Sequence, residues 1–183
     1  PEVKEFYNWK QTMEDIQFMC SLLNELTTFN NSSTLHYSVF PIGGLLKNIA
    51  ISFAISLDSE DSEIRFSSRI SPELGEFTGD KVKLEEVVLN LLRNAKDAVK
   101  DDGVITLSAD KENSQIVIRC TDNGCGIPDD ETDRIFDPFF SHKEGGTGLG
   151  LSLSRRIVEA HRGTISVSSS HESGTVFTVT LPV

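Results

Sequence analysis

A glycine-rich run at residues 145–150 (GGTGLG) is the first stretch whose composition suggests binding chemistry. Glycine loses more conformational entropy on folding than any other residue, so four glycines in six positions need a reason. Such a run can turn successive amides toward an anion, and a helix that begins near Leu149 would add its positive end. The run matches neither a P-loop nor the dinucleotide-binding pattern. Taken alone, it fits a flexible loop before a helix equally well.

A predicted helix that follows Asp80 and runs to about Lys100 carries the second candidate group. Its apolar residues recur on one face, and four polar residues share the other: Glu86, Asn90, Asn94 and Asp97. Two asparagines one turn apart are unfavourable for helix propensity. Their amide oxygens suit Mg²⁺, which keeps substrate phosphates among its ligands. The stripe weakly indicates a ligand-facing side, and a solvated polar face is the plain alternative.

A carboxylate at the end of a predicted strand is the third candidate. Residues 119–130 read RCTDNGCGIPDD, so a strand runs into Asp122 and glycines then break it. An aspartate there could accept a hydrogen bond from the exocyclic amine of adenine and would repel the carbonyl of guanine. The glycines would leave room for a flat ring. An ordinary turn would have the same composition.

Aromatic residues and a lysine precede the glycine run. The segment 136–146 (FDPFFSHKEGG) exposes these side chains in a predicted loop, and Lys143 stands near its end. A loop of this kind suits a lid that closes on phosphate.

Charge and cysteine content limit the possible functions. The 183 residues suffice for one domain with a core, and the formal net charge of −11 argues against a nucleic-acid partner. The three cysteines form no metal-binding or disulfide pattern, which favours a reducing compartment. The beginning of the chain does not resemble a signal peptide, and residues 38–57 are too polar for a membrane span. We therefore expect a cytoplasmic chain without a membrane segment.

The remaining pattern predicts an α+β fold, with helices on one face of a mostly antiparallel sheet. Residues 3–30 carry apolar positions at alternating spacings of three and four, which indicates a helix packed on its own domain or, slightly better, half of a bundle. A turn-rich boundary follows at 29–38. Helices are expected at 41–57, 80–100, 129–136 and 149–161. Strands are expected at 64–70, 104–109, 115–122, 163–170 and 175–183, with a turn at 110–114 and another at 171–174.

Taken in order, the motifs resemble those of a known family. NLLRNAKDA (90–98) looks like the N box, DNGCGIP (122–128) like the first glycine box, FDPFF (136–140) like the phenylalanine box, and GGTGLGLS (145–152) like the second glycine box. Together they are similar to the catalytic, ATP-binding domain of bacterial sensor histidine kinases over residues 41–183. Four linked motifs are far more specific than any one of them.

The resemblance implies a two-layer α/β sandwich of the Bergerat type, preceded by a long N-terminal helix. It implies a catalytic ATP-binding domain at 37–183, and residues 1–36 look like the second helix of the dimerisation and phosphoacceptor hairpin. It also implies site roles. Asn94 would coordinate Mg²⁺ with support from Asn90, Asp122 would read adenine, and Lys143 would reach the terminal phosphates, which makes Asn90 and Lys143 the catalytic candidates. The other residues implied to bind ATP are Asp97, Gly124, Gly126, Ile127, Phe140, Gly146, Thr147, Gly148, Leu149 and Gly150.

Two departures from related families bear on the reaction. Related chaperone and topoisomerase ATPases carry a water-activating glutamate where Asn90 stands, so its absence favours phosphoryl transfer over rapid hydrolysis. The phosphoacceptor segment of the sensor kinases is not found in this sequence. The four histidines are interpreted as ordinary loop and surface residues: His36, His142, His161 and His171. We therefore expect the chain to be a truncation that begins after the first hairpin helix.

The resemblance implies transfer of the γ-phosphoryl group of ATP to a histidine on a dimerisation domain, and relay to an aspartate of a response regulator. The full-length protein would be a homodimer, and its membrane anchorage lies outside these residues. Two alternatives stay open: a catalytically silent nucleotide-binding scaffold, and a protein-serine kinase of the anti-sigma type. Cys125 would lie beside the nucleotide, although a small residue filling a turn is the simpler interpretation.

Overall fold

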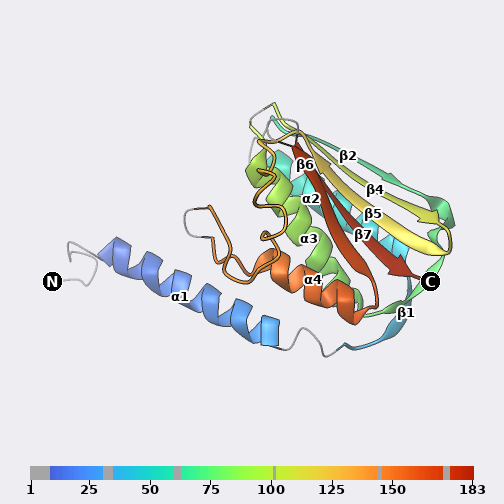
Figure 1. The fold of residues 1–183 in the computed structure, drawn as a ribbon, viewed down its shortest axis with the longest axis horizontal. Coiled ribbons are helices and arrows are strands. Elements are labelled where there is room, and N and C mark those ends of the chain that lie inside the picture. Colours follow the sequence, from blue (N-terminus) through green and yellow to red (C-terminus); the bar gives the residue numbers. More distant parts are fainter. Residues whose placement is uncertain (1–8, 31–34, 60–62, 101, 144–145, 171–173) are drawn as a thin grey trace.

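A five-stranded sheet with helices on one face forms the body of the molecule (Figure 1). The computed structural model describes residues 9–30, 35–59, 63–100, 102–143, 146–170 and 174–183. The strands lie in the order β2-β4-β5-β7-β6, and only β2 and β4 run parallel. Their bounds are β2 Arg65–Ile70, β4 Val104–Glu112, β5 Gln115–Asp122, β6 Thr164–Ser170 and β7 Gly174–Pro182. The predicted α+β class is confirmed, and the one parallel pair makes the sheet mixed.

Three helices cover the sheet: α2 (Ile42–Ser59), α3 (Lys81–Ala98) and α4 (Gly150–Ala160). Each lies within two residues of its predicted bounds. Asp80 caps α3, because its side chain accepts a hydrogen bond from the Lys83 amide. The apolar face of α3 is buried against the sheet and its neighbouring helices: Leu84, Val87, Val88, Leu91, Leu92 and Ala95. This packing fixes the direction of the opposite, polar face.

The hairpin between β4 and β5 is tighter than its composition suggested. The predicted five-residue turn at 110–114 shrinks to Asn113 and Ser114, which both have positive φ angles of 49° and 62°. Two residues with positive φ are what a type I′ hairpin turn requires, so the strands continue to Glu112 and from Gln115.

A second, two-stranded sheet was not predicted. β1 (Ser38–Pro41) pairs antiparallel with β3 (Glu76–Gly79), and η2 (Pro72–Leu74) leads into β3. Phe40 and Phe77 face one another edge to face across this pair, with ring centroids 6.2 Å apart. The predicted helix at 129–136 is wrong, because this segment forms successive turns instead. The amides of Glu131 and Arg134, for example, each donate to the carbonyl oxygen three residues earlier.

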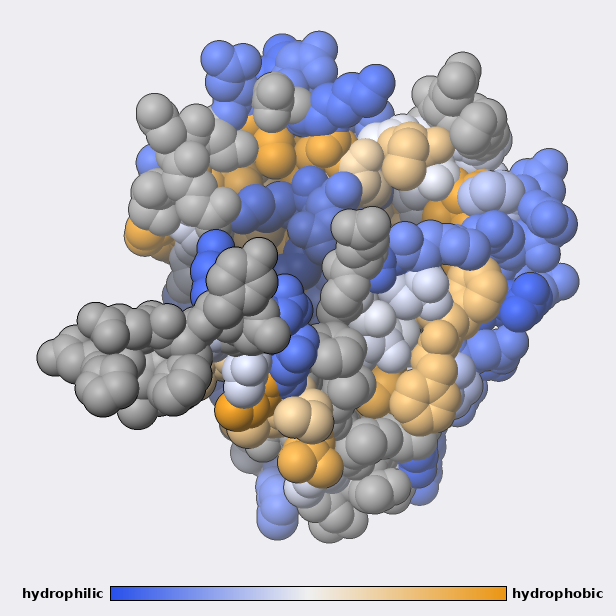
Figure 2. Space-filling view, turned by 90° about the vertical axis from the view of Figure 1, so that its left-hand side faces the viewer, coloured by the Kyte–Doolittle hydropathy of each residue, from blue (hydrophilic) through white to orange (hydrophobic). Residues whose placement is uncertain are grey.

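The N-terminal helix α1 (Trp9–Asn30) extends away from the body and contacts α4 (Figure 1). Its predicted apolar seam is exposed where the structure describes it, at Trp9, Met13 and Ile16. The first residues of that seam, 3–8, lie outside the described residues, as do residues 171–173 of the turn predicted at 171–174. On this side of the molecule, Figure 2 shows apolar residues as separate patches among hydrophilic ones. None of the described helices is long and apolar enough to cross a membrane.

One histidine is not where the sequence interpretation put it. His161 was taken for a loop or surface residue, but it is 5% exposed. Its Nε2 accepts a hydrogen bond from the Asp80 amide at 2.9 Å, and its Nδ1 lies 2.7 Å from the Ile157 carbonyl oxygen. The first bond makes Nε2 an acceptor, which leaves Nδ1 as the donor to the Ile157 carbonyl oxygen. His36 and His142 are exposed as expected, and His171 lies outside the described residues.

Candidate nucleotide site

Helix α3 forms a common wall for the predicted site residues. Asn90 and Asn94 are half-buried and Asp97 is exposed on its polar face. The beginning of α4 lies against Asn90, because a Cβ atom added to Gly150 would come 2.6 Å from the Asn90 Oδ1 atom. The predicted polar stripe therefore faces another predicted part of the site rather than solvent alone.

Lys143 lies against the same face of α3. Its ammonium nitrogen donates to the Asp97 carboxylate at 2.7 Å and to the Asn94 Oδ1 atom at 3.2 Å. A cation is thus already held between the oxygen atoms of these two residues. Lys143 is nevertheless exposed, so the segment that carries it can exchange this contact for another.

The glycine run enters α4 through a left-handed turn. Gly148 has a φ of +68°, and an added Cβ would come 2.5 Å from the Phe139 carbonyl carbon, so only glycine fits. The backbones of Phe139 and Gly148 are joined by a hydrogen bond of 3.0 Å. Leu149 is the N-cap residue, and no side chain caps the helix there. An uncapped helix start of this kind attracts anions.

The other residues of the run surround this turn. Thr147 Oγ1 accepts a hydrogen bond from the Leu149 amide at 3.3 Å. Gly146 is exposed, and an added Cβ there would come 2.5 Å from Ser141 Oγ. The structure therefore brings Gly146, Thr147, Gly148, Leu149 and Gly150 together at one end of α4.

Asp122 ends β5 with a buried carboxylate. It is 5% exposed and accepts a hydrogen bond from the Gly124 amide at 2.8 Å. Burial raises the pKa of this carboxyl group above its ordinary 3.8, against the opposite effect of hydrogen bonds from the Gly124 and Thr175 amides. Burial together with Asp122 also raises the pKa of the neighbouring Cys120 thiol to about 12, so this thiol is protonated and unreactive.

The glycines after Asp122 bring the following loop against the C-terminal end of α3. A Cβ on Gly124 would come 2.5 Å from the Ala98 carbonyl oxygen, and the Cys125 amide donates to that oxygen at 3.1 Å. Gly126 has a positive φ of 72°. The loop then returns to the sheet, where the amide of the half-buried Ile127 donates to Ser169 Oγ at 2.8 Å.

Phe140 lies in the segment between this loop and the glycine run. It is half-buried, and the Arg134 guanidinium lies 4.9 Å from the centre of its ring. The His142 ring stands edge-on to Phe140 at 5.1 Å, and His142 Nε2 lies 3.0 Å from a carboxylate oxygen of Glu131. These contacts give the segment that carries Lys143 a defined conformation.

Two supporting contacts were missed by the sequence interpretation. Asn90 Nδ2 donates to the buried Ser154 Oγ at 2.9 Å, and His161 accepts from the Asp80 amide. Ser154 follows Gly150 by four residues, so the two lie on the same side of α4. A small and a polar residue at this spacing on a buried helix face could have signalled a close approach.

The described residues contain no group of three or more His, Cys, Asp or Glu side chains that could hold a metal ion by themselves. The amide and carboxylate oxygens that hold the Lys143 ammonium are nonetheless suited to a hard cation such as Mg²⁺, which takes few protein ligands and several from phosphates and water. The donor set therefore fits Mg²⁺ that arrives with a phosphorylated ligand.

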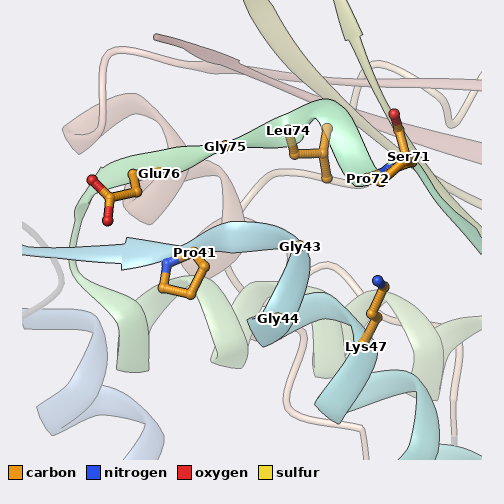
Figure 3. A pocket seen from close by; sticks show the side chains of 9 residues that line it. All are labelled: Pro41, Gly43, Gly44, Lys47, Ser71, Pro72, Leu74, Gly75 and Glu76. Carbon is orange, nitrogen blue, oxygen red and sulfur yellow. The ribbon is translucent and has the colours of Figure 1, made fainter.

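An open hollow of about 330 Å³ lies elsewhere, between the beginning of α2 and the η2–β3 segment. Figure 3 shows Lys47 and Glu76 at opposite sides of it. No residue of the predicted site lines this hollow, so Asp122, the amide stripe of α3 and the glycine turn all lie outside it.

Comparison with known proteins agrees with this geometry. Residues 79–183 match the family described as "Histidine kinase-, DNA gyrase B-, and HSP90-like ATPase". The chain is 41% identical over 129 residues to the sensor histidine kinase ZraS of Escherichia coli K12, which covers 70% of this chain and 28% of ZraS. This chain therefore spans less than a third of the length of that relative.

Two solved structures share the fold. The catalytic domain of the histidine kinase ThkA superimposes with a TM-score of 0.71 and 28% identity, over 80% of this chain and 95% of that domain. Full-length ShkA in complex with AMPPNP, at 24% identity, superimposes with a TM-score of 0.82 over 98% of this chain and 39% of its own. The second match extends the likeness of fold to the N-terminal helix.

Proposed function

We infer the function of this chain from its family. The chain belongs to the histidine kinase-, DNA gyrase B- and HSP90-like ATPases, and we infer that it is the catalytic ATPase domain of a two-component sensor histidine kinase. From this we propose that it transfers the γ-phosphoryl group of ATP to a histidine on a dimerisation domain. The observation that carries the proposal is the arrangement around α3. Helix α3 holds the amide stripe, contacts the loop after Asp122, and receives both Lys143 and the glycine-rich beginning of α4.

We propose that Asp122 selects adenine. Its buried carboxylate can accept a hydrogen bond from the exocyclic amine of adenine. A base that presents an acceptor at this place would leave the buried charge unpaired, which costs binding free energy. Gly124 and Gly126 leave the ring room beside the backbone, while Ile127 and Phe140 offer apolar surface. Adenine binding would thus fix one end of the nucleotide.

The phosphates would bind at the other end, against the amides at the beginning of α4. Gly146, Thr147, Gly148, Leu149 and Gly150 form that end of the site. Lys143 would leave Asp97 for the terminal phosphate, because the phosphate carries more charge than the carboxylate that Lys143 contacts. The segment that carries Lys143 would act as the lid.

Asn94 would hold Mg²⁺, with Asn90 and Asp97 supporting it. The oxygens of Asn94 and Asp97 accept the Lys143 ammonium in this structure, which supports their fitness for a cation. When bound, Mg²⁺ would neutralise phosphate charge.

The protein's part in the reaction would be to orient and neutralise. The neutral imidazole nitrogen of the acceptor histidine attacks the γ-phosphorus in line, and the bond to the bridging oxygen breaks. ADP leaves with that oxygen, and the imidazole proton passes to water. No general base is needed in this chain, which agrees with an asparagine at position 90.

The proposed partners are those of a full-length sensor histidine kinase. We propose that residues 1–36 belong to the dimerisation hairpin and 37–183 to the catalytic domain, that the full-length protein is a homodimer, and that its phosphohistidine serves a response regulator. The exposed apolar seam of α1 supports a partner helix. Because the reaction consumes ATP, we place it in the cytoplasm.

A transfer assay separates this function from its alternatives. The chain is mixed with radiolabelled ATP and a separately prepared hairpin domain that carries a phosphoacceptor histidine. An acid-labile, base-stable label on the hairpin is the expected result, and a hairpin with its acceptor histidine replaced by alanine is the control. An acid-stable label would indicate a serine kinase, and nucleotide binding without any label would indicate a silent scaffold.

A further inference from the structure

Ser154 is a polar residue on the buried face of α4. It is 2% exposed, and its neighbours on that face, Leu153 and Ile157, belong to the hydrophobic core. A buried hydroxyl group destabilises a protein unless it is hydrogen-bonded. The Ser154 hydroxyl meets this requirement through Asn90, whose Nδ2 donates to its oxygen at 2.9 Å. The two residues are 64 positions apart in the sequence.

The amide of Asn90 lies over Gly150 and is bonded at its nitrogen end. A Cβ added to Gly150 would be 2.6 Å from the Asn90 oxygen and 3.1 Å from its nitrogen, and this nitrogen donates to Ser154. Gly150 and Ser154 are one turn apart on α4, so the side chain of Asn90 lies along that turn. The close approach depends on the missing Cβ of Gly150.

The orientation of this amide decides its chemistry. An asparagine side chain has an acceptor at one end and two donors at the other, and a half-turn exchanges them with little change in shape. The end that faces Gly150 lies at the uncapped start of α4. The amides there are donors at the positive end of a helix, so an oxygen is favoured toward them and the NH₂ group is favoured away.

We propose that Ser154 is a positioning residue that holds the Asn90 NH₂ group, so that the Asn90 oxygen faces the place where phosphate and cation bind. This inference rests on the proposed function, because it takes the beginning of α4 as the phosphate site. Without the hydroxyl, the Asn90 NH₂ group loses its buried partner, and the side chain is no longer held along this turn of α4. The affinity that Mg²⁺ adds to nucleotide binding then falls.

A second buried serine on α4 supplies a matched control. Ser152 is 3% exposed, and its hydroxyl donates to the Leu149 carbonyl oxygen at 2.9 Å. Replacing Ser152 by alanine removes a buried hydroxyl group from the same helix and leaves the Asn90–Ser154 contact unchanged. Ser154→Thr and Ser154→Val form a second matched pair, because threonine and valine have nearly the same shape and only threonine has a hydroxyl group.

The test is calorimetric titration of the chain with a non-hydrolysable ATP analogue, once with excess Mg²⁺ and once with a chelator. The quantity compared is the ratio of the two affinities. Ser154→Ala is expected to lower this ratio about two- to tenfold, which corresponds to the loss of one hydrogen bond. Ser152→Ala is expected to leave it unchanged. Ser154→Thr is expected to keep the ratio above that of Ser154→Val.

Two outcomes would overturn the inference. One is a Ser154→Ala ratio equal to that of the unmodified chain, which includes an equal loss of both affinities, as a merely structural role predicts. The other is an equal lowering of the ratio by Ser154→Ala and Ser152→Ala. If threonine does not fit the buried position, the two alanine variants decide alone. An unmodified chain that binds no nucleotide under either condition would instead refute the proposed function, and this inference with it.

Discussion

Lys143 and Asp97 are joined by a hydrogen-bonded ion pair of 2.7 Å between the lid segment and the polar face of α3. The same ammonium contacts the Asn94 oxygen at 3.2 Å. A positive charge therefore lies between the oxygens that we propose for the cation site. Binding of Mg²⁺ and ATP at this place requires the lysine to move.

The first prediction concerns Lys143. Lys143→Gln should lower phosphoryl transfer to the hairpin domain about tenfold or more, because a charge that stabilises the transferring phosphoryl group is removed. Its effect on thermal stability should be small, since the ion pair is half exposed. Single-turnover rates measure phosphoryl transfer, and a melting curve measures thermal stability. Lys111→Gln, an exposed lysine at the β4–β5 hairpin, is the control. Equal transfer rates for the two variants would contradict the proposed role.

The second prediction concerns Asp122. Asp122→Asn should abolish detectable ATP binding, because the amide side chain has one acceptor oxygen where the carboxylate has two. The same change should leave the nucleotide-free chain folded at neutral pH, since a buried charge is removed and an amide oxygen can still accept from Gly124. Calorimetry and urea unfolding test the two statements. Asp110→Asn, on β4, is the control. ATP affinity retained in Asp122→Asn would refute the adenine assignment.

The third prediction follows from the raised pKa of Asp122. A carboxyl group whose pKa is higher in the folded than in the unfolded state stabilises the fold when protonated, and this contribution is lost as the pH rises through the folded value. Adenine recognition needs the ionised form. ATP affinity should therefore weaken on acidification at a pH above 3.8, the ordinary value for aspartate. Titrations at several pH values, with near-UV circular dichroism to verify folding, measure this. A pH-independent affinity throughout the folded range would contradict it.

Local patterns predicted the parts of the site that depend on one element. Asn90 and Asn94 share a helix face, and Asp122 ends a strand; both follow from periodicity within a few residues. The contacts missed were those between elements distant in sequence. Asn90 meets Ser154 only because α3 packs on α4. His161 looked exposed because a helix ends there, yet the pairing of residues 38–41 with 76–79 brings Asp80 onto its ring. Strands of four residues carry too little pattern to predict.

The fourth prediction concerns His161. Its replacement by alanine should lower the free energy of unfolding by about 2–3 kcal/mol, because the Asp80 amide loses its acceptor and a buried ring is removed. Asp80 itself caps α3 and also accepts from the His36 amide at 2.8 Å, so the change loosens the junction before α3. His36→Ala keeps that backbone amide and removes only an exposed ring, and it should cost little. Urea unfolding compares the two. Similar losses for both variants would contradict the buried role of His161.

The fifth prediction concerns Gly148. Gly148→Ala forces a side chain into a positive φ and against the Phe139 backbone, at a cost of about 1–2 kcal/mol from the backbone conformation alone. The turn that presents the start of α4 must then change, whereas Asp122 and its loop stay as they are. ATP affinity should fall about five- to thirtyfold, and adenosine affinity should change less than twofold. Gly44→Ala is the matched control, because a Cβ there meets only the Pro41 ring, at 3.6 Å. Equal losses of ATP and adenosine affinity in Gly148→Ala would show that the turn supports the whole site rather than the phosphates.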